Sequence, residues 1–315
     1  MRLTGFSVIL IMLFALYGTA QAIDDNAGTS GAQFLKIDVG ARPSGMGGAF
    51  TAVADDITSI AWNPAGLSDI SINEISFMHN RLFDGEAAHN FAAYGHSFDE
   101  WGGFGLSYVD VSVSDIERRD INEMPGGEVD VSDRAVSLGY GAKVFAYCRL
   151  GITFRYIFQK LDEESANSFG GDLGALLGAD DRPWQVGLAV QNIGTEVKFE
   201  EEGDPQPLTF RLGFSYRFFD DKLVTAVDVV KARDADFGGS FGVEYIIKKM
   251  IALRAGYRAR PELDLSGMEG ITAGAGIILG GIRDWSHFVG AIDYAYVPFA
   301  ETLGDSHRFS LSLKF

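Results

Sequence analysis

The strongest constraint on the fold of this chain is an alternation of apolar and polar residues that begins near Ser71 and continues to the end. Residues 150–159 read Leu-Gly-Ile-Thr-Phe-Arg-Tyr-Ile-Phe-Gln, and residues 184–191, 208–218 and 308–315 follow the same pattern. A period of two is typical of a strand with one apolar face. The segments run to about ten residues, the length that crosses a bilayer at a tilt.

About 14 such segments follow one another. They begin near residues 71, 88, 101, 133, 149, 171, 184, 207, 223, 239, 250, 270, 287 and 306. Short connections are expected at 98–101, 179–183, 219–222 and 247–250, and longer ones at 115–130, 162–170, 197–207 and 260–269. Short and long connections alternate in the same way in bacterial outer-membrane barrels, as periplasmic turns and outer loops.

The membrane explains why such strands must close on themselves. Hydrocarbon offers no partner to a free N–H or C=O group, so an all-β span has no open edge. After the N-terminal region no run of 18 or more apolar residues occurs, which excludes helical spans. The sequence therefore predicts an all-β fold, a closed antiparallel transmembrane β-barrel of about 14 strands in the outer membrane of a bacterial cell.

The first residues have the features of an export signal. Arg2 precedes an apolar run from Phe6 to Leu16, and Ala20-Gln21-Ala22 fits a cleavage site for small residues. An uncleaved anchor is the competing interpretation. We expect a signal peptide at 1–22, a plug-like segment at 23–69 and the barrel at 70–315. The single cysteine, Cys148, excludes an intrachain disulfide.

The plug-like segment differs in composition from the strands that follow it. Residues 40–67 are dense in Gly and Ala, and Gly40–Gly48 is expected to form a tight turn. A short helix is expected from Ala49 to Ile60, ended by Asn63-Pro64 because the residue before proline avoids the helical region. Its glycines would allow close packing against the lumen wall. The candidate residues of the segment are Gly40, Arg42, Gly45, Met46, Gly47, Gly48, Asp55, Asp56, Asn63, Pro64 and Gly66.

Charged residues occupy inward-facing positions of the predicted strands. They either attract an anion or the polar end of a ligand, or form a paired network that fills the lumen and holds the N-terminal segment. Buried charges need partners, which favours the network. These residues are Arg155, Arg211, Arg217, Asp228, Glu244, Arg254, Arg258 and Asp293.

Several functional classes find no support. A net charge of -17 argues against nucleic acid as a partner. The five histidines show no metal-ligand spacing. The cluster Gly45–Gly48 lacks the lysine of a phosphate loop, and the Gly-x-Ser-x-Gly string at 238–242 enters a strand rather than a helix. We therefore expect no enzyme activity, no cofactor and no metal.

Two parts of the chain resemble a known family. Residues 34–37, 40–42, 45–50, 54–56 and 62–67 resemble the N-terminal signature of the PorV/PorQ family, within the wider FadL-like group of outer-membrane proteins. The last strand, His307 to Phe315, resembles the terminal signal by which the barrel assembly machinery recognises its substrates. The resemblance implies a 14-stranded barrel whose N-terminal segment folds into the lumen.

The resemblance leaves the function open between two classes. Members like PorV imply a partner role in type IX secretion or surface attachment, with secretion-system proteins or exported cargo as partners. Members like FadL imply a channel for small hydrophobic molecules. That alternative gains support if Phe104, Tyr108, Phe154 and Phe210 line the lumen. A mainly structural outer-membrane protein, in contact only with membrane lipid, is the third possibility.

Overall fold

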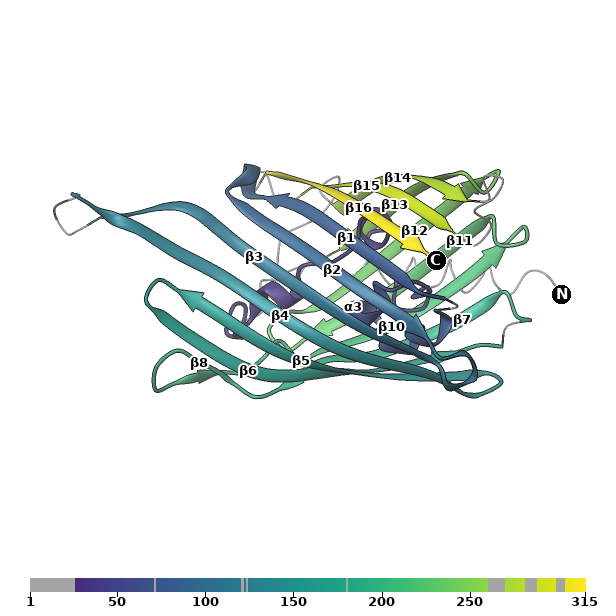
Figure 1. Ribbon diagram of the computed structural model, residues 1–315, viewed down its shortest axis with the longest axis horizontal. Coiled ribbons are helices and arrows are strands. Elements are labelled where there is room, and N and C mark those ends of the chain that lie inside the picture. The colour runs from purple at the N-terminus through teal and green to yellow at the C-terminus, as the bar shows by residue number, and fades with distance from the viewer. Residues whose placement is uncertain are drawn as a thin grey trace.

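The computed structural model describes residues 26–70, 72–119, 122, 124–179, 181–259, 270–280, 288–298 and 304–315. The predicted signal peptide and the predicted long connection at 260–269 lie outside the described residues. Fourteen strands form a closed antiparallel barrel, as predicted (Figure 1). Among the described residues, no helix is long and apolar enough to cross a membrane.

The barrel strands follow one another around the wall in chain order. They are β1 (Glu74–Leu82), β2 (Ala87–Ser97), β3 (Gly103–Arg119), β4 (Pro125–Phe145), β5 (Cys148–Leu161), β6 (Glu164–Leu177), β7 (Trp184–Gly194), β10 (Thr209–Phe218), β11 (Leu223–Ala232), β12 (Phe237–Ile247), β13 (Ile251–Ala259), β14 (Ile271–Gly280), β15 (Val289–Pro298) and β16 (Asp305–Lys314). A separate hairpin consists of β8 (Val197–Lys198) and β9 (Gly203–Asp204).

The helices are short and lie mostly before the first strand. They are η1 (Gln33–Lys36), α2 (Ala41–Gly45), α3 (Ser59–Trp62), η2 (Pro64–Asp69), η3 (Phe83–Gly85) and η4 (Asp99–Trp101), where η denotes a 3-10 helix.

The barrel closes where the first strand meets the last. β1 pairs with β16 from Glu74 opposite Lys314 to Arg81 opposite His307. Beyond these strands, the backbone of Asn73 and Phe315 exchanges two further hydrogen bonds of 3.0 and 2.9 Å. Every described barrel strand is thus paired on both sides, which satisfies the backbone groups that a membrane leaves without partners.

The prediction of a helix from Ala49 to Ile60 was wrong. Helical turns lie instead at α2 and at α3, which ends at Trp62, before Asn63-Pro64 as expected. Between the two helices, the barrel wall takes the place of helical partners. The N–H groups of Phe50 and Thr51 donate to Asp228 of β11 at 3.1 and 2.9 Å. Proline in the first turn favours α2, because its missing N–H has no helical partner there.

The wall is much taller on one side than on the other. β4 has 21 residues and β3 has 17, whereas β13 has nine. These long strands project beyond the rest of the barrel at the end opposite the C-terminus (Figure 1). The prediction of long loops at 115–130 and 162–170 was therefore wrong, because most of those residues belong to β3, β4 and β6.

In the projecting part of β3, apolar side chains face inward and polar side chains face outward, the reverse of the lower part of the strand. Along the lower part of β3 the outward side chains are Phe104, Leu106 and Tyr108, and the next outward positions are Asp110 and Ser112. The inner face of β3 changes at the same height as the outer face. Its inward residues are glycine and serine below that height, and above it they are Val109, Val111 and Val113.

The outer face becomes polar at one height on β3 and β4, where Asp110 lies opposite Arg134, and one outward position later on β5, where Phe158 precedes Lys160. Tyr108 of β3 lies opposite Val136 of β4, and Val136 lies opposite Tyr156 of β5. Apolar outward residues need lipid around them, and polar outward residues need water. Tyrosine is common at the interface between the two. The row from Tyr108 to Tyr156 therefore marks one membrane boundary.

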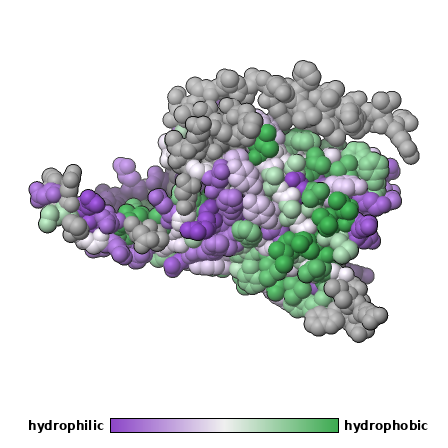
Figure 2. All heavy atoms as spheres, turned by 90° about the horizontal axis from the view of Figure 1, so that it is seen from above, coloured by the Kyte–Doolittle hydropathy of each residue, from purple (hydrophilic) through white to green (hydrophobic). Residues whose placement is uncertain are grey.

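We call the part above this boundary the projecting sheet; it comprises residues 109–119, 125–135, 157–161 and 164–168. Figure 2 agrees with the boundary, since hydrophobic residues gather over the half of the molecule near the short turns. The half that carries the long β3–β4 hairpin is largely hydrophilic on the same view.

A pair of arginine substitutions tests this boundary. Ile152→Arg places a charge on the outer face of β5 within the apolar band, and we expect it to destabilise the barrel by about 2–4 kcal/mol. Ser132→Arg, on the outer face of the projecting sheet, should change stability by less than about 0.5 kcal/mol. Urea unfolding in lipid vesicles measures both, and equal losses would contradict the assigned boundary.

Candidate functional site

The N-terminal residues run around the inside of the barrel. We call residues 32–70 the inner segment. Beginning at β16, it meets the strands in reverse order through hydrogen bonds to their inward side chains. These bonds join Ala41 N to Ser310 of β16, Gly45 O to Thr272 of β14, Gly47 O to Arg258 of β13, Ala52 O to Ser215 of β10, Ala61 O to Gln191 of β7, and Ile60 O to Thr153 of β5.

The wall has glycine where the inner segment passes. At each of these positions a Cβ atom would contact the segment at 3.1 Å or less. Four of them, Gly103, Gly141, Gly151 and Gly174, lie directly opposite one another across four adjacent strands. The inner segment thus packs directly on the backbone of the wall at these positions, with its own backbone at most of them and with side chains at Gly95, Gly105 and Gly139. The full set is Gly95, Gly103, Gly105, Gly139, Gly141, Gly151, Gly174, Gly187, Gly213, Gly242, Gly256 and Gly274.

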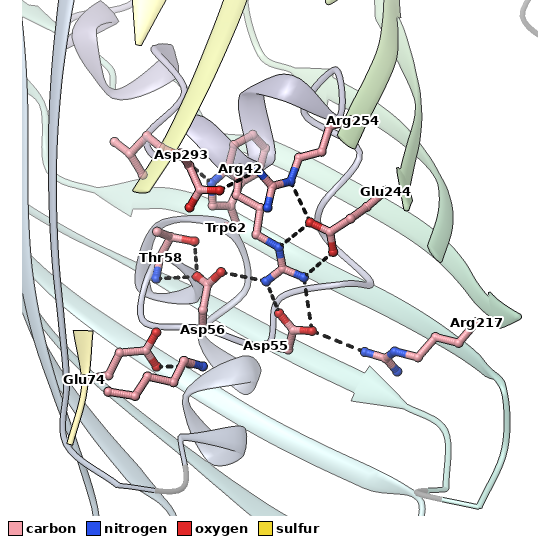
Figure 3. A network of polar contacts seen from close by, with 12 residues as sticks. Arg42, Asp55, Asp56, Thr58, Trp62, Glu74, Arg217, Glu244, Arg254 and Asp293 are labelled. Carbon is pink, nitrogen blue, oxygen red and sulfur yellow. Dashed lines mark hydrogen bonds and ion pairs between the residues drawn. The ribbon is translucent and has the colours of Figure 1, made fainter. Parts of the chain in front are cut away.

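Arg42 is the centre of an ion network that joins the inner segment to the wall (Figure 3). Its guanidinium lies 2.5 Å from Asp55 and 2.9 Å from Asp56. Two further nitrogens donate to both oxygens of Glu244 on β12, at 3.0 and 2.9 Å. Such a bidentate pair fixes direction as well as distance. Arg42 therefore holds two parts of the inner segment and one strand together.

The network continues into the wall. Arg254 of β13 donates to Glu244 at 2.6 Å and to Asp293 of β15 at 2.6 Å. Arg217 of β10 lies 3.6 Å from Asp55. The network thus contains four carboxylates and three arginines, and each carboxylate lies within ion-pair distance of at least one guanidinium.

The protonation of the two inner-segment groups reflects these contacts. Burial by itself would raise the pKa of Asp55, but the charge and hydrogen bond of Arg42 outweigh it and hold that pKa at about 2. Burial likewise opposes the charge of Arg42, yet Asp55, Glu244 and Asp56 raise its pKa well above the usual value. Both groups are charged at neutral pH.

The other predicted lumen charges are also paired. Arg155 lies 2.5 Å from Asp172, and Arg258 lies 2.5 Å from Asp38. The guanidinium of Arg211 donates to Gln191 at 2.7 Å and lies 5.0 Å from the ring centroid of Trp62. With Asp228, which accepts the two N–H groups described above, all eight predicted positions contact partners in the lumen.

Asn63 of the predicted signature joins two turns of the inner segment to β6. Its side-chain amide donates to Thr51 O at 2.9 Å and to Ala175 O at 3.1 Å, and its oxygen accepts from Ala65 N at 3.2 Å. Pro64 begins η2 directly after it. At Gly66, a Cβ would collide with the carbonyl of Ala54, so only glycine fits.

The glycines near α2 have conformations that favour glycine. Gly40, Gly47 and Gly48 have φ of 85, 67 and 77°. Gly45 packs against Gly274 of β14, and Met46 is fully buried.

Sequence reasoning missed some of the residues that hold the segment. Arg308 of β16 donates to the carbonyl of Asp38 and to the hydroxyl of Ser44, both at 2.7 Å. Lys36 and Asp234 form another pair at 3.1 Å. Arg308 is one of the polar residues that alternate with apolar ones in the last strand, so the sequence pattern could have predicted that it faces the lumen.

The cavities within the lumen are small. Two of about 40 Å³ each lie beside residues 34–39, and Gln191, Asn192 and Arg211 line both. A larger one of about 230 Å³ lies at the short-turn end beside Arg42 and Lys314. The four aromatic residues whose position in the lumen would have supported a hydrophobic channel lie on the outer face instead. They are Phe104, Tyr108, Phe154 and Phe210, from 37 to 56% exposed.

Comparison with known proteins gives the family. The family model of the type IX secretion system protein PorV matches residues 20–233. This chain belongs to the PorV family. A UPF0164 protein of Treponema pallidum (strain Nichols) is 27% identical over 172 residues, which are 50% of this chain and 52% of that protein. The match thus spans about half the length of this curated relative.

Solved structures show the same fold at low identity. The CymD monoaromatic hydrocarbon channel superposes with a TM-score of 0.60 at 12% identity, over 88% of this chain and 97% of CymD. A Pseudomonas aeruginosa FadL homologue gives 0.55 at 14%, over 88% and 98%. The Pseudomonas putida toluene transporter TodX gives 0.52 at 14%, over 81% and 92%.

Two glycine substitutions test the packing of the inner segment. Gly256→Ala places a methyl group against the backbone of Met46 and Gly47, and we expect a loss of about 1–3 kcal/mol. Gly290→Ala is the matched control, because its nearest neighbours are 3.9 Å away. Urea unfolding in vesicles compares them, and equal stability of the two variants would contradict the close packing.

Removing the central arginine should have a larger effect. Arg42→Ala removes the arginine that faces Asp56 and leaves Glu244 only Arg254 and Asp55 only Arg217, and we expect a loss of about 3 kcal/mol. Arg182→Ala, an exposed arginine in a short turn, should cost less than about 1 kcal/mol. The same unfolding measurement checks both, and a small loss at Arg42 would mean that the network contributes little to stability.

Proposed function

We propose that this protein is an outer-membrane partner in the secretion of other proteins or in their attachment to the cell surface. Its membership of the PorV family supports this role. On this proposal residues 23–69 act as a plug and residues 70–315 form the barrel around it. The single observation that carries the proposal is the inner segment, which packs against the strands and is tied to them by ion pairs. A lumen filled in this way suits a partner protein better than an open pore.

The orientation follows from the general rule for such barrels. Short turns face the periplasm and long connections face outward. The C-terminus and the cavity of about 230 Å³ then lie at the periplasmic end. The projecting sheet lies at the cell exterior, where exported proteins arrive. The terminal Phe315, stacked on Phe288 at 6.1 Å, is the residue that the assembly machinery would recognise.

The second candidate is a channel for small hydrophobic molecules. The likeness of the fold to CymD and TodX favours it. Such a channel needs an apolar path, however, and the cavities beside residues 34–39 are small and have polar and charged residues in their lining. Movement of the inner segment would be required first. We therefore rank this function second.

One experiment separates the two functions. The full-length protein, tagged at an outer connection, is isolated from its own bacterium in mild detergent, and the bound molecules are identified. We expect secretion-system components or exported proteins to be enriched over a matched preparation of an unrelated barrel. Deletion of the gene should then leave those exported proteins in the periplasm.

The alternative makes a different prediction in a reconstituted system. Vesicles that contain the purified protein would take up toluene faster than vesicles that contain the same unrelated barrel. Accelerated toluene uptake together with normal export in the deletion strain would overturn the secretion role.

A further inference from the structure

The inner face of the projecting sheet is mainly apolar, although it lies above the membrane boundary; its polar residues include Gln159, which donates to Asp133 at 2.8 Å. Val111 of β3, Ala135 of β4 and Ile157 of β5 share this face and are buried. Below the boundary, the inward positions of the same strands are glycine, serine, threonine and arginine. The apolar inner face is therefore a separate feature and not a continuation of the polar lumen.

The chain itself covers the lower part of this face. Phe34 is buried in one cluster with Val111, Ala135 and Ile157, and Leu35 and Ile37 pack against that cluster. The inner segment thus already uses the sheet as a surface for apolar side chains of η1 and of Ile37, which follows it.

The upper part of the same face is accessible. Leu161 is 52% exposed and Ile116 is 36% exposed. Val131 pairs with Leu161 and with Val113, and Val129 pairs with Ile116, so these side chains share one side of the sheet. We call this set the apolar strip; it comprises Val113, Ile116, Val129, Val131 and Leu161. On β3 the strip continues through Val111 the surface that Phe34 occupies, whereas on β4 and β5 the pair Asp133 and Gln159 lies between the two.

A strand edge borders the apolar strip. β2 begins at Ala87, which lies opposite Val113, so the later residues of β3 extend beyond it. Within the described chain, Ile116–Arg119 pairs with β4 and has no strand on its other side. Such an edge presents backbone N–H and C=O groups to an added strand. On the same face, Arg118 forms an ion pair with Asp162 beyond the strip.

We propose that the apolar strip and the adjacent edge of β3 bind an extended segment of an exported protein. The edge would supply backbone hydrogen bonds, and the strip would take alternate apolar side chains, as in other cases of strand addition. The occupant is thus a polypeptide with apolar residues at every second position. This inference rests on the proposed secretion role and names the surface that carries it out.

The test uses a photocrosslinking amino acid at single positions of the full-length protein in its own bacterium. The probe is an epitope-tagged exported protein found by the isolation described above. Leu161 and Ile116 lie on the apolar strip, and their chain neighbours Lys160 and Glu117 lie on the opposite face. We expect crosslinks to the tagged protein from the first pair, at least tenfold stronger than those from the second pair.

Introduction of charge on the apolar strip provides a second measurement. The double variant Ile116→Asp and Leu161→Asp should reduce the amount of tagged protein that co-purifies at least fivefold. Lys160→Asp and Glu117→Lys, on the outer face, should leave it unchanged. Resistance of each variant to unfolding in cold SDS shows that the barrel has formed.

Three outcomes would overturn the inference. Equal crosslinking from both faces would mean that the exported protein does not use the strip. Crosslinks from Leu161 only to a second copy of this chain, or to lipid, would assign the strip another occupant. If export still fails on deletion of the gene while these positions give no crosslink, the secretion role stands and the surface is wrong.

Discussion

The structure depends on close contact between the backbone of the inner segment and the glycines of the wall. Because each of these wall positions lacks a side chain, the segment lies against the strands instead of crossing the lumen. The missing side chains of Gly151 and Gly174 leave room for Asn63-Pro64, and that of Gly256 leaves room for Met46 and Gly47. A close-packed interior has no room for even one added methylene without a cost. This packing places polar groups along the segment within hydrogen-bond distance of seven barrel strands, among them Ser310 of β16 and Thr153 of β5.

The ion pairs are a consequence of that placement. Arg42 reaches Asp55 and Glu244 because α2 packs beside β13, β14 and β15, and the turn that carries Asp55 returns to the same side. A buried charge pair of this kind contributes little net stability, but removal of one partner is costly. The network therefore specifies one arrangement of the segment more than it strengthens the barrel.

The solvent outside the wall explains both the successes and the errors of sequence analysis. Lipid outside and polar groups inside produce the alternation that predicted the strands, and β7 and β11 begin at the expected residues 184 and 223. Above Tyr108 and Tyr156 water replaces lipid, so the alternation changes phase. The predicted strands began too late at 133 and 171 because the reversed pattern was interpreted as loop. The actual strands begin at Pro125 and Glu164.

The sequence by itself determined the strand number, the closed barrel and the inward position of the charged residues. It did so because period-two patterns are local and every strand of a membrane barrel must obey them. Only the tertiary structure decided which charges pair, since Arg42 and Glu244 are 202 residues apart. It also decided the path of the inner segment. Within the helix expected at Ala49–Ile60, the N–H groups of Phe50 and Thr51 donate to Asp228 instead, a partner that no local pattern identifies.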